Sequence, residues 1–208
     1  MLRIETLEPH AFSLLEQIMK IAELKNFSLV GGTALSLYYG HRKSDDLDLF
    51  STNPFDNSTI VSVLEKKFGG SFVNRSTNPH FGIFGFVDDV KIDLIHYPHH
   101  LIRPEINVDG IRMFSIEDII AMKVQAILGR GKKKDFWDVA ELLLHFTITD
   151  FINFHKEKYA SQNLLITVPQ AITYFADAEE SEDPISLKNQ TWDSVKEFIS
   201  SKVREYLR

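Results

Sequence analysis

A pair of glycines, Gly31 and Gly32, stands shortly before two aspartates, Asp46 and Asp48, in the segment 30–50, which reads VGGTALSLYYGHRKSDDLDLF. Adjacent glycines let backbone N–H groups approach a phosphate closely, and the first turn of a following helix adds its partial positive charge. The two aspartates lie two apart in a strand-like stretch, so their carboxylates point to the same face. Taken singly, each would be an ordinary strand-edge acid. Together with the glycine pair, they predict metal-assisted chemistry on a nucleotide.

A third carboxylate, Asp93, lies within the otherwise apolar stretch 90–95, VKIDLI. The isoleucine and leucine on either side of it share one face of a strand, so Asp93 points to the other face. If this strand pairs beside the strand that carries Asp46 and Asp48, three carboxylates converge. Their repulsion would raise their pKa values unless a cation neutralises them, so the set predicts two Mg²⁺ ions as cofactors. The alternative for Asp93 is an exposed acid on a half-buried strand.

Lys123 projects from the apolar face of an expected helix, since isoleucines stand three, four and seven positions before it. Such a lysine either extends to the rim of the core or directs its ammonium at an anion in a cleft. We favour the second interpretation, with a triphosphate as the anion. The basic triplet His41, Arg42 and Lys43, just before the aspartates, is either a further source of positive charge for phosphates or a surface loop.

A basic loop leads into an acidic helix start in the segment 129–138, which reads GRGKKKDFWD. Asp135 and Asp138 share a helix face because they lie three apart. In one interpretation Arg130 and the lysines hold polyphosphate or RNA backbone, while the acids orient Lys123 or Arg130. In the other, the acids complement the helix dipole and the lysines are solvated.

The surrounding sequence predicts the elements that position these residues. Before residue 115 we expect helices over 9–25, 33–39 and 53–70, and strands over 27–30, 46–50, 71–77, 82–87, 90–96 and 111–114. After it we expect helices over 115–129, 135–146, 149–159, 166–176 and 191–207.

Local signals define several of these boundaries. Asn53–Pro54 is a helix start, Asp88–Asp89 a hairpin turn, and Ser115 with Asp118 a capping box. The acidic run 177–184 is typical of a solvated linker. The pattern predicts an α+β protein, with a mixed sheet flanked by helices over 1–114 and a C-terminal helical part over 115–208.

The composition restricts the class of protein. The chain has 208 residues, of which 44% are hydrophobic, and a formal net charge of -6. This length and apolar content suit one domain or a domain with a small appendage, and any nucleic-acid contact must be local because there is no global basic field. The chain has no cysteine, which excludes disulfides and thiolate chemistry. Neither a membrane span nor a signal-peptide core is present, which predicts a soluble cytoplasmic protein.

The order of these motifs resembles the active-site pattern of the DNA polymerase β-like nucleotidyltransferase superfamily. More narrowly, it is similar to the AbiEii/AbiGii toxin branch. The matching blocks are GGTAL, then GHRKSDDLDLF, then Lys123, then KDFWDVA, and they span about residues 30 to 142. Several blocks in this order are far more specific than one glycine pair. The resemblance implies a nucleotidyltransferase-type sheet in the α+β fold.

The resemblance also implies roles for individual residues. The expected roles are triphosphate binding by Gly31, Gly32 and Thr33, metal binding by Asp46 and Asp48, a third carboxylate at Asp93, the family lysine at Lys123, and the family's late acidic pair at Asp135 and Asp138. Gly32 stands where many superfamily members have serine, so a hydroxyl for the phosphate is lost unless Thr33 supplies it.

The implied function is Mg²⁺-dependent transfer of a nucleoside monophosphate from a nucleoside triphosphate to an acceptor hydroxyl. The acceptor would be RNA, such as the acceptor end of tRNA, and the protein a toxin of a bacterial toxin–antitoxin or abortive-infection system with a cognate antitoxin. One alternative is the same chemistry on a small molecule such as an antibiotic. Another is a nucleotide-binding module that no longer turns over. A metal-dependent glycosyltransferase would leave the glycine pair and Lys123 unexplained.

Overall fold

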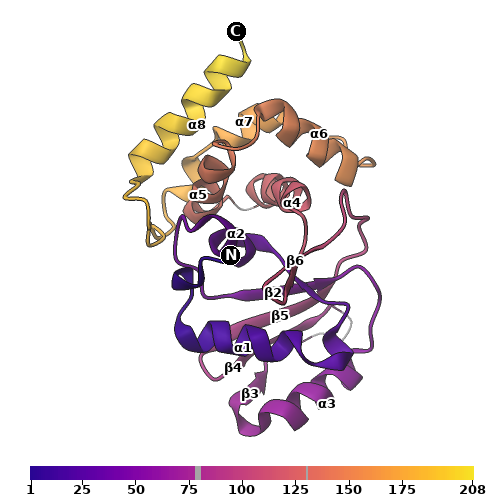
Figure 1. Cartoon of the computed structure of the whole chain (residues 1–208). Coiled ribbons are helices and arrows are strands. Elements are labelled where there is room, and N and C mark those ends of the chain that lie inside the picture. The colour runs from indigo at the N-terminus through magenta and orange to yellow at the C-terminus, as the bar shows by residue number, and fades with distance from the viewer. Residues whose placement is uncertain (78–80, 130) are drawn as a thin grey trace.

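A mixed sheet forms the centre of the protein in the computed structural model, which describes residues 1–77, 81–129 and 131–208 (Figure 1). The described strands form one seven-stranded sheet in the order β3-β4-β5-β2-β1-β7-β6. They are β1 Ser28–Leu29, β2 Leu47–Ser51, β3 Phe72–Asn74, β4 Ile83–Val87, β5 Val90–His96, β6 Ile106–Val108 and β7 Ile111–Met113. The strand β2 pairs parallel with β5 and antiparallel with β1, so the sheet is mixed as expected.

Helices cover both sides of this sheet. They are α1 Pro9–Met19, α2 Gly31–Tyr39, α3 Asn57–Phe68, α4 Ile116–Gly129, α5 Lys133–Leu142, α6 Ile148–Lys158, α7 Val168–Ile172 and α8 Trp192–Tyr206. In Figure 1, α1 and α3 lie on one side of the sheet, and α2 with the helices from α4 onward lies on the other. This arrangement confirms the α+β fold predicted from the sequence, while the division into parts at residue 114 remains a prediction.

The alternation of side chains along β2 orients the strand. Leu47 and Leu49 have no exposed surface, whereas Asp48 and Phe50 are only partly buried. Because successive side chains of a strand point to opposite faces, the two leucines enter the core and Asp48 faces the other side. The apolar positions of this five-residue strand therefore fix where its acids lie.

The helix that follows β2 begins later than the sequence suggested. We expected a start at Asn53–Pro54, but α3 begins at Asn57. The carboxylate of Asp56 accepts a hydrogen bond from the backbone N–H of Thr59 at 2.7 Å, which satisfies a donor that the helix leaves free. The aspartate cap therefore overrides the proline signal.

The sheet also contains a strand that the sequence analysis missed, β6. It pairs antiparallel with β7 through a turn at Asp109 and Gly110, which both have positive φ angles, 53° and 85°. An Asp-Gly pair is a strong hairpin signal, so this strand was open to prediction. The expected turn at Asp88 is present, with a φ of 51°.

The capping interaction at the start of α4 is half of the one expected. The N–H of Asp118 donates to the hydroxyl of Ser115 at 3.1 Å, as predicted. The Asp118 carboxylate instead accepts from the N–H of Ile102 at 3.0 Å and from Lys158 Nζ at 2.6 Å. Asp118 thus ties α4 to α6 and to the loop after β5. Within the described ranges, no helix is both long and apolar enough to cross a membrane.

Candidate active site

The parallel pairing of β2 with β5 brings two of the predicted acids together. Asp48 and Asp93 are direct partners in the register, so their side chains leave the sheet on the same face. Asp46 immediately precedes β2 and lies two residues before Asp48. The expectation that these strands are neighbours is confirmed.

Two of these three carboxylates have a lysine as partner. Asp93 Oδ2 accepts from Lys91 Nζ at 2.5 Å, and Asp46 Oδ2 lies 3.4 Å from Lys134 Nζ. The second oxygen of Asp93 is buried and has no hydrogen-bond partner among the described residues. An anionic oxygen in this state is costly, so the acids have unused capacity to bind a cation.

Among the three carboxyl groups, Asp48 has a clearly raised pKa. Burial raises the pKa of the Asp48 carboxyl above its usual value, and the negative charge of Asp93 raises it further. A divalent cation would relieve both effects, so the donor set suits Mg²⁺, which prefers carboxylate oxygens. In the described part of the chain, no three His, Asp or Glu side chains are placed to hold one metal ion together. To bind one, Asp46 and Asp93 would have to release the lysines that they now contact.

The glycine pair opens α2 directly, and both glycines are required by their neighbours. Gly31 has a φ of +70°, and a Cβ there would lie 3.1 Å from Asp48 Oδ2. A Cβ on Gly32 would lie 2.0 Å from Nη2 of Arg42. The first glycine therefore admits a carboxylate and the second a guanidinium. This places the helix start, an anion-binding feature, between negative and positive side chains.

The hydroxyl of Thr33 is already engaged. Thr33 is buried, and its Oγ1 donates to the backbone oxygen of Asp46 at 2.5 Å and lies 2.8 Å from Ser44 Oγ. It holds the loop before β2 against α2. Thr33 reaches the edge of the cavity described below, but its hydrogen bonds are made within the protein.

A buried network surrounds Asp138. Its carboxylate receives His41 Nε2 at 2.7 Å, Arg42 Nε at 2.7 Å and Nη2 at 3.0 Å, and Lys123 Nζ at 2.6 Å. Lys123 also donates to Asp135 at 3.0 Å. His41 and Arg42 are buried and so do not form the surface loop that the sequence allowed, whereas Lys43 is partly exposed and lies 3.8 Å from Glu8. The two acids orient Lys123, which was one of the interpretations open from the sequence.

The network determines the protonation of its members. Burial alone would raise the pKa of Asp138, but the charges of Arg42 and Lys123 outweigh it and hold that pKa well below the usual range. Burial alone would lower the pKa of Lys123, but Asp138 and Asp135 outweigh it and raise that pKa. Asp138 is therefore ionised and Lys123 is charged at neutral pH.

One cavity of about 170 Å³ collects most of these groups. It is lined by Val30, Gly31, Gly32, Thr33, Arg42, Ser44, Asp46, Asp48, Phe50, Ile119, Met122, Lys123, Ala126, Lys134 and Asp135. Its walls thus combine the glycine turn, three acids, three cations and an apolar side. Asp93 and Asp138 lie outside the lining, and Arg130 is outside the described residues.

Arg42 is a cavity residue for which sequence reasoning left two interpretations open, a cation for phosphates or part of a surface loop. The triplet of which it is part follows a helix-ending glycine, Gly40, and resembles an ordinary basic loop. The missing side chain at Gly32 was the available signal, because a second cation beside a phosphate turn needs that space. Its partner Asp138 is 96 positions away, which no local pattern connects.

The family whose model matches this chain is one of nucleotidyltransferases. The model of the family described as nucleotidyl transferase AbiEii toxin, type IV toxin–antitoxin system, matches residues 13–205. The chain therefore belongs to the AbiEii nucleotidyltransferase toxin family, as the sequence motifs indicated.

One curated protein is similar in sequence, and two solved structures are similar in fold. The uncharacterized protein aq_aa25 of Aquifex aeolicus is 34% identical over 200 residues, which cover 93% of this chain and 94% of that protein. JHP933 from Helicobacter pylori is 16% identical, with a TM-score of 0.57 over 96% of this chain and 92% of its own. The nucleotidyltransferase toxin MenT4 from Mycobacterium tuberculosis is 14% identical, with a TM-score of 0.57 over 95% and 85% of the two chains. The two structures show that the fold is shared.

Proposed function

We propose that the protein transfers a nucleoside monophosphate from a nucleoside triphosphate to a hydroxyl group of RNA, with Mg²⁺ as cofactor. The observation that carries this proposal is the single cavity lined by Gly31, Gly32, Asp46, Asp48 and Lys123. It brings a phosphate turn, metal-binding acids and a buried cation together in one place. Such preorganised charge is what phosphoryl transfer requires.

The triphosphate would lie between the start of α2 and two fixed cations. Backbone N–H groups at Gly31 and Gly32 bind phosphate oxygens, while Arg42 and Lys123 neutralise their charge. Asp138 and Asp135 do not need to touch the nucleotide. Their role is to hold the two cations in place, because a buried guanidinium and ammonium would otherwise lack counter-charges.

Asp46, Asp48 and Asp93 would bind the metal ions. Bound Mg²⁺ supplies Lewis-acid charge at the transferring phosphoryl group. The acceptor oxygen forms a bond to the α-phosphorus, and the bond to the bridging oxygen breaks, so that pyrophosphate leaves with the electron pair. Asp93, with one oxygen unpartnered, takes up the proton of the acceptor hydroxyl. The acceptor therefore approaches from the β5 side.

The proposal includes an RNA acceptor and a toxin role. The family description, a toxin of a type IV toxin–antitoxin system, supports the toxin role, and we infer RNA as the acceptor because its modification would arrest growth. A cognate antitoxin encoded beside this chain, and action inside a bacterial cytoplasm, belong to the same proposal.

Incubation with each labelled nucleoside triphosphate, Mg²⁺ and total RNA tests the proposal. We expect label in RNA and release of pyrophosphate with the wild-type protein, and neither with Asp46→Ala combined with Asp48→Ala. Circular dichroism and a melting curve verify that the double variant is folded. Transfer that survives in the folded double variant contradicts the proposal.

A small-molecule acceptor is the second candidate, because a cavity of about 520 Å³ adjoins the first and has an acidic wall. The two cavities share Arg42, Ser44, Asp46 and Lys134, and the acidic wall includes Glu180 and Glu182. Carboxylates beside the site would favour an acceptor that carries ammonium groups. Label on an aminated small molecule, and none on RNA, would select this candidate.

A further inference from the structure

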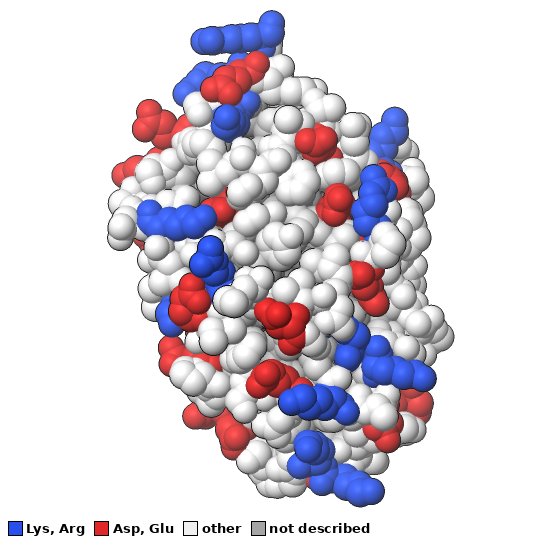
Figure 2. Space-filling model, in the orientation of Figure 1, with Lys and Arg blue, Asp and Glu red and all other residues white. Residues whose placement is uncertain are grey.

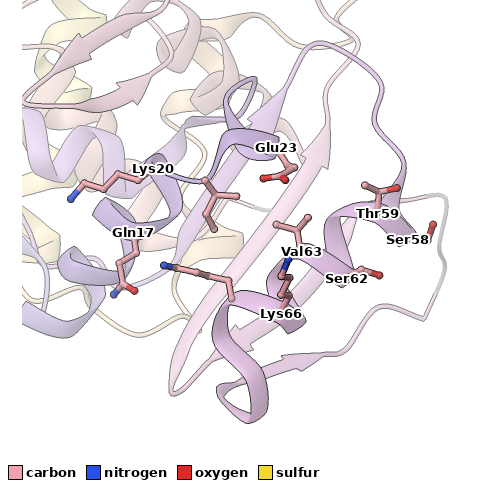
Figure 3. A pocket seen from close by; sticks show the side chains of 10 residues that line it. Gln17, Lys20, Glu23, Ser58, Thr59, Ser62, Val63 and Lys66 are labelled. Atoms are coloured by element: carbon pink, nitrogen blue, oxygen red, sulfur yellow. The ribbon is translucent and has the colours of Figure 1, made fainter.

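A second groove, of about 760 Å³, lies away from the catalytic cavity, between the end of α1 and the outer face of α3 (Figure 3). Its lining consists of Gln17, Lys20, Ile21, Glu23, Ser58, Thr59, Ser62, Val63, Lys66 and Lys67. None of these residues also lines the catalytic cavity. Three ammonium groups and one carboxylate give the groove a positive charge.

The three lysines of the groove differ from most others in the chain. Buried or half-exposed lysines such as Lys123, Lys158 and Lys188 have a carboxylate within 4.0 Å. Among the described residues, no carboxylate lies this close to Lys20, Lys66 or Lys67. Figure 2 shows basic side chains gathered over the part of the surface where α1 and α3 lie. In a chain of net charge -6, this is a local reversal of sign.

The donors on α3 form two rows along one helix face. Ser58, Ser62 and Lys66 follow one another at intervals of four residues, and Thr59 and Lys67 belong to the adjacent row. The hydroxyls of Ser58 and Thr59 already donate to the Asp56 carboxylate, at 2.6 and 2.7 Å, so the lysines supply the charge of this face. At 1.5 Å per residue, Ser58 and Lys67 are separated by about 13 Å along the helix. That length is several times the roughly 3.4 Å that separates successive phosphates of one strand along a nucleic-acid helix axis.

The opposite wall supplies matching groups. Lys20 and Gln17 come from the end of α1, while Ser62 and Lys66 come from α3 (Figure 3). Each of these side chains carries a donor for phosphate oxygens, and the serine and the glutamine can also accept. The groove contains no aromatic side chain on which a base could stack. The groove therefore suits the phosphate backbone of a nucleic acid and does not distinguish base sequences.

We propose that this groove binds the phosphate backbone of the RNA acceptor, at a distance from the hydroxyl that reacts. The inference rests on the proposed function, because the partner is the RNA that receives the nucleotide. The groove lies on the α1–α3 side of the sheet and the paired acids on the other. A structured RNA is long enough to present one end to Asp46 and Asp48 while phosphates further along it contact Lys20, Lys66 and Lys67.

Binding of bulk tRNA, followed by fluorescence anisotropy over a range of salt concentrations, tests the groove. The test variant is Lys20→Glu with Lys66→Glu and Lys67→Glu, and the matched control is Lys156→Glu with Arg204→Glu and Arg208→Glu. All six residues are exposed, so the charge change is the same and folding should be kept. A triple Lys→Gln version of the test variant serves if charge reversal disturbs the fold.

We expect the test variant to weaken tRNA binding at least tenfold and to lower the slope of log Kd against log salt by about 2. The control should stay within about twofold of the wild type, and nucleotide affinity should be unchanged in both. Equal tRNA affinity of the test variant and the wild type would overturn the groove proposal. An equal loss of tRNA affinity in the control variant would also overturn it.

The two proposals fail in different ways. If the wild type labels RNA and the folded test variant binds and labels it equally well, the groove is wrong and the proposed function stands. If Asp46→Ala with Asp48→Ala still transfers label, the proposed function is wrong, whatever the groove binds. If the wild type does not bind tRNA at all, the groove proposal is overturned.

Discussion

The carboxylate of Asp138 on α5 accepts two hydrogen bonds from the guanidinium of Arg42. Nε donates to one oxygen at 2.7 Å, and Nη2 donates to the other at 3.0 Å. Both side chains are buried, and Lys123 and His41 share the same carboxylate. One acid thereby joins the loop before β2 to the helices α4 and α5. A change at Asp138 should affect both the stability of the protein and the charge of its cavity.

Replacing Asp138 with asparagine should lower the free energy of unfolding by about 3 to 5 kcal/mol, because it leaves Arg42 and Lys123 as buried cations without that counter-charge. Urea unfolding followed by circular dichroism measures the effect. Asp150 provides the control, because its partly exposed carboxylate accepts from the N–H of Thr147 at the start of α6, and Asp150→Asn should cost only about 1 kcal/mol or less. Similar losses in the two variants would show that the network is not structural.

The same carboxylate should contribute to acid unfolding. Because the folded-state pKa of Asp138 lies well below 3.8, the unfolded chain binds the proton first as the pH falls. The contribution is complete above the usual carboxyl range and declines below it. We therefore expect the free energy of unfolding to fall between about pH 5 and pH 3, and to fall less steeply in Asp138→Asn. Parallel curves for the two proteins would contradict the pKa assignment.

A methyl group at Gly32 should displace Arg42. A Cβ there would lie 2.0 Å from the Arg42 guanidinium and 3.3 Å from Asp138 Oδ2, so the charge-assisted pair must shift. A pair of this kind is worth about 1.5 to 3 kcal/mol, so we expect Gly32→Ala to weaken nucleotide binding by about tenfold or more. Calorimetric titration with a nucleoside triphosphate measures this. Gly70→Ala, where no atom lies within 4 Å of the new Cβ, should bind as the wild type does.

Neutralising Asp48 should keep or raise the stability of the metal-free protein and weaken its binding of metal. Its charge is buried and lies beside that of Asp93, so Asp48→Asn removes a repulsion when no metal is present. In EDTA, the melting temperature of the variant should equal or exceed that of the wild type. With Mg²⁺ and a nucleoside triphosphate, the wild type should gain several degrees and the variant little. An equal gain in both would remove Asp48 from the metal site.

The elements with strong local signals were predictable from the sequence. The strand β5 runs from Val90 to His96 as expected, because its period of two and the Asp88 turn are both visible in the chain. The helix α4 likewise ends at Gly129 as predicted. The start of α3 was not predictable from proline alone, since the hydrogen bond that the Asp56 carboxylate accepts from the N–H of Thr59 determines it.

The candidate site was predictable in its residue types more than in its connections. The glycine turn and the two acids lie within residues 30–50, and the antiparallel pairing of β1 with β2 brings them together. The pairing of Asp48 with Asp93 depends on the strand order, which remained conditional until β2 and β5 were seen together. The burial of His41 and Arg42 depends on Asp138, far along the chain, and a composition rule would place such residues at the surface.

The register of β2 against β5 also limits how the chain can change its length. An extra residue between Val90 and Asp93 would turn the acid toward the core and deliver an isoleucine to the cleft, because side chains alternate along a strand. An extra residue in the turn at Asp88 would lengthen a loop and leave the strand in place. Insertions and deletions among related chains should therefore accumulate at the hairpin turn, while the three residues before Asp93 keep a constant count.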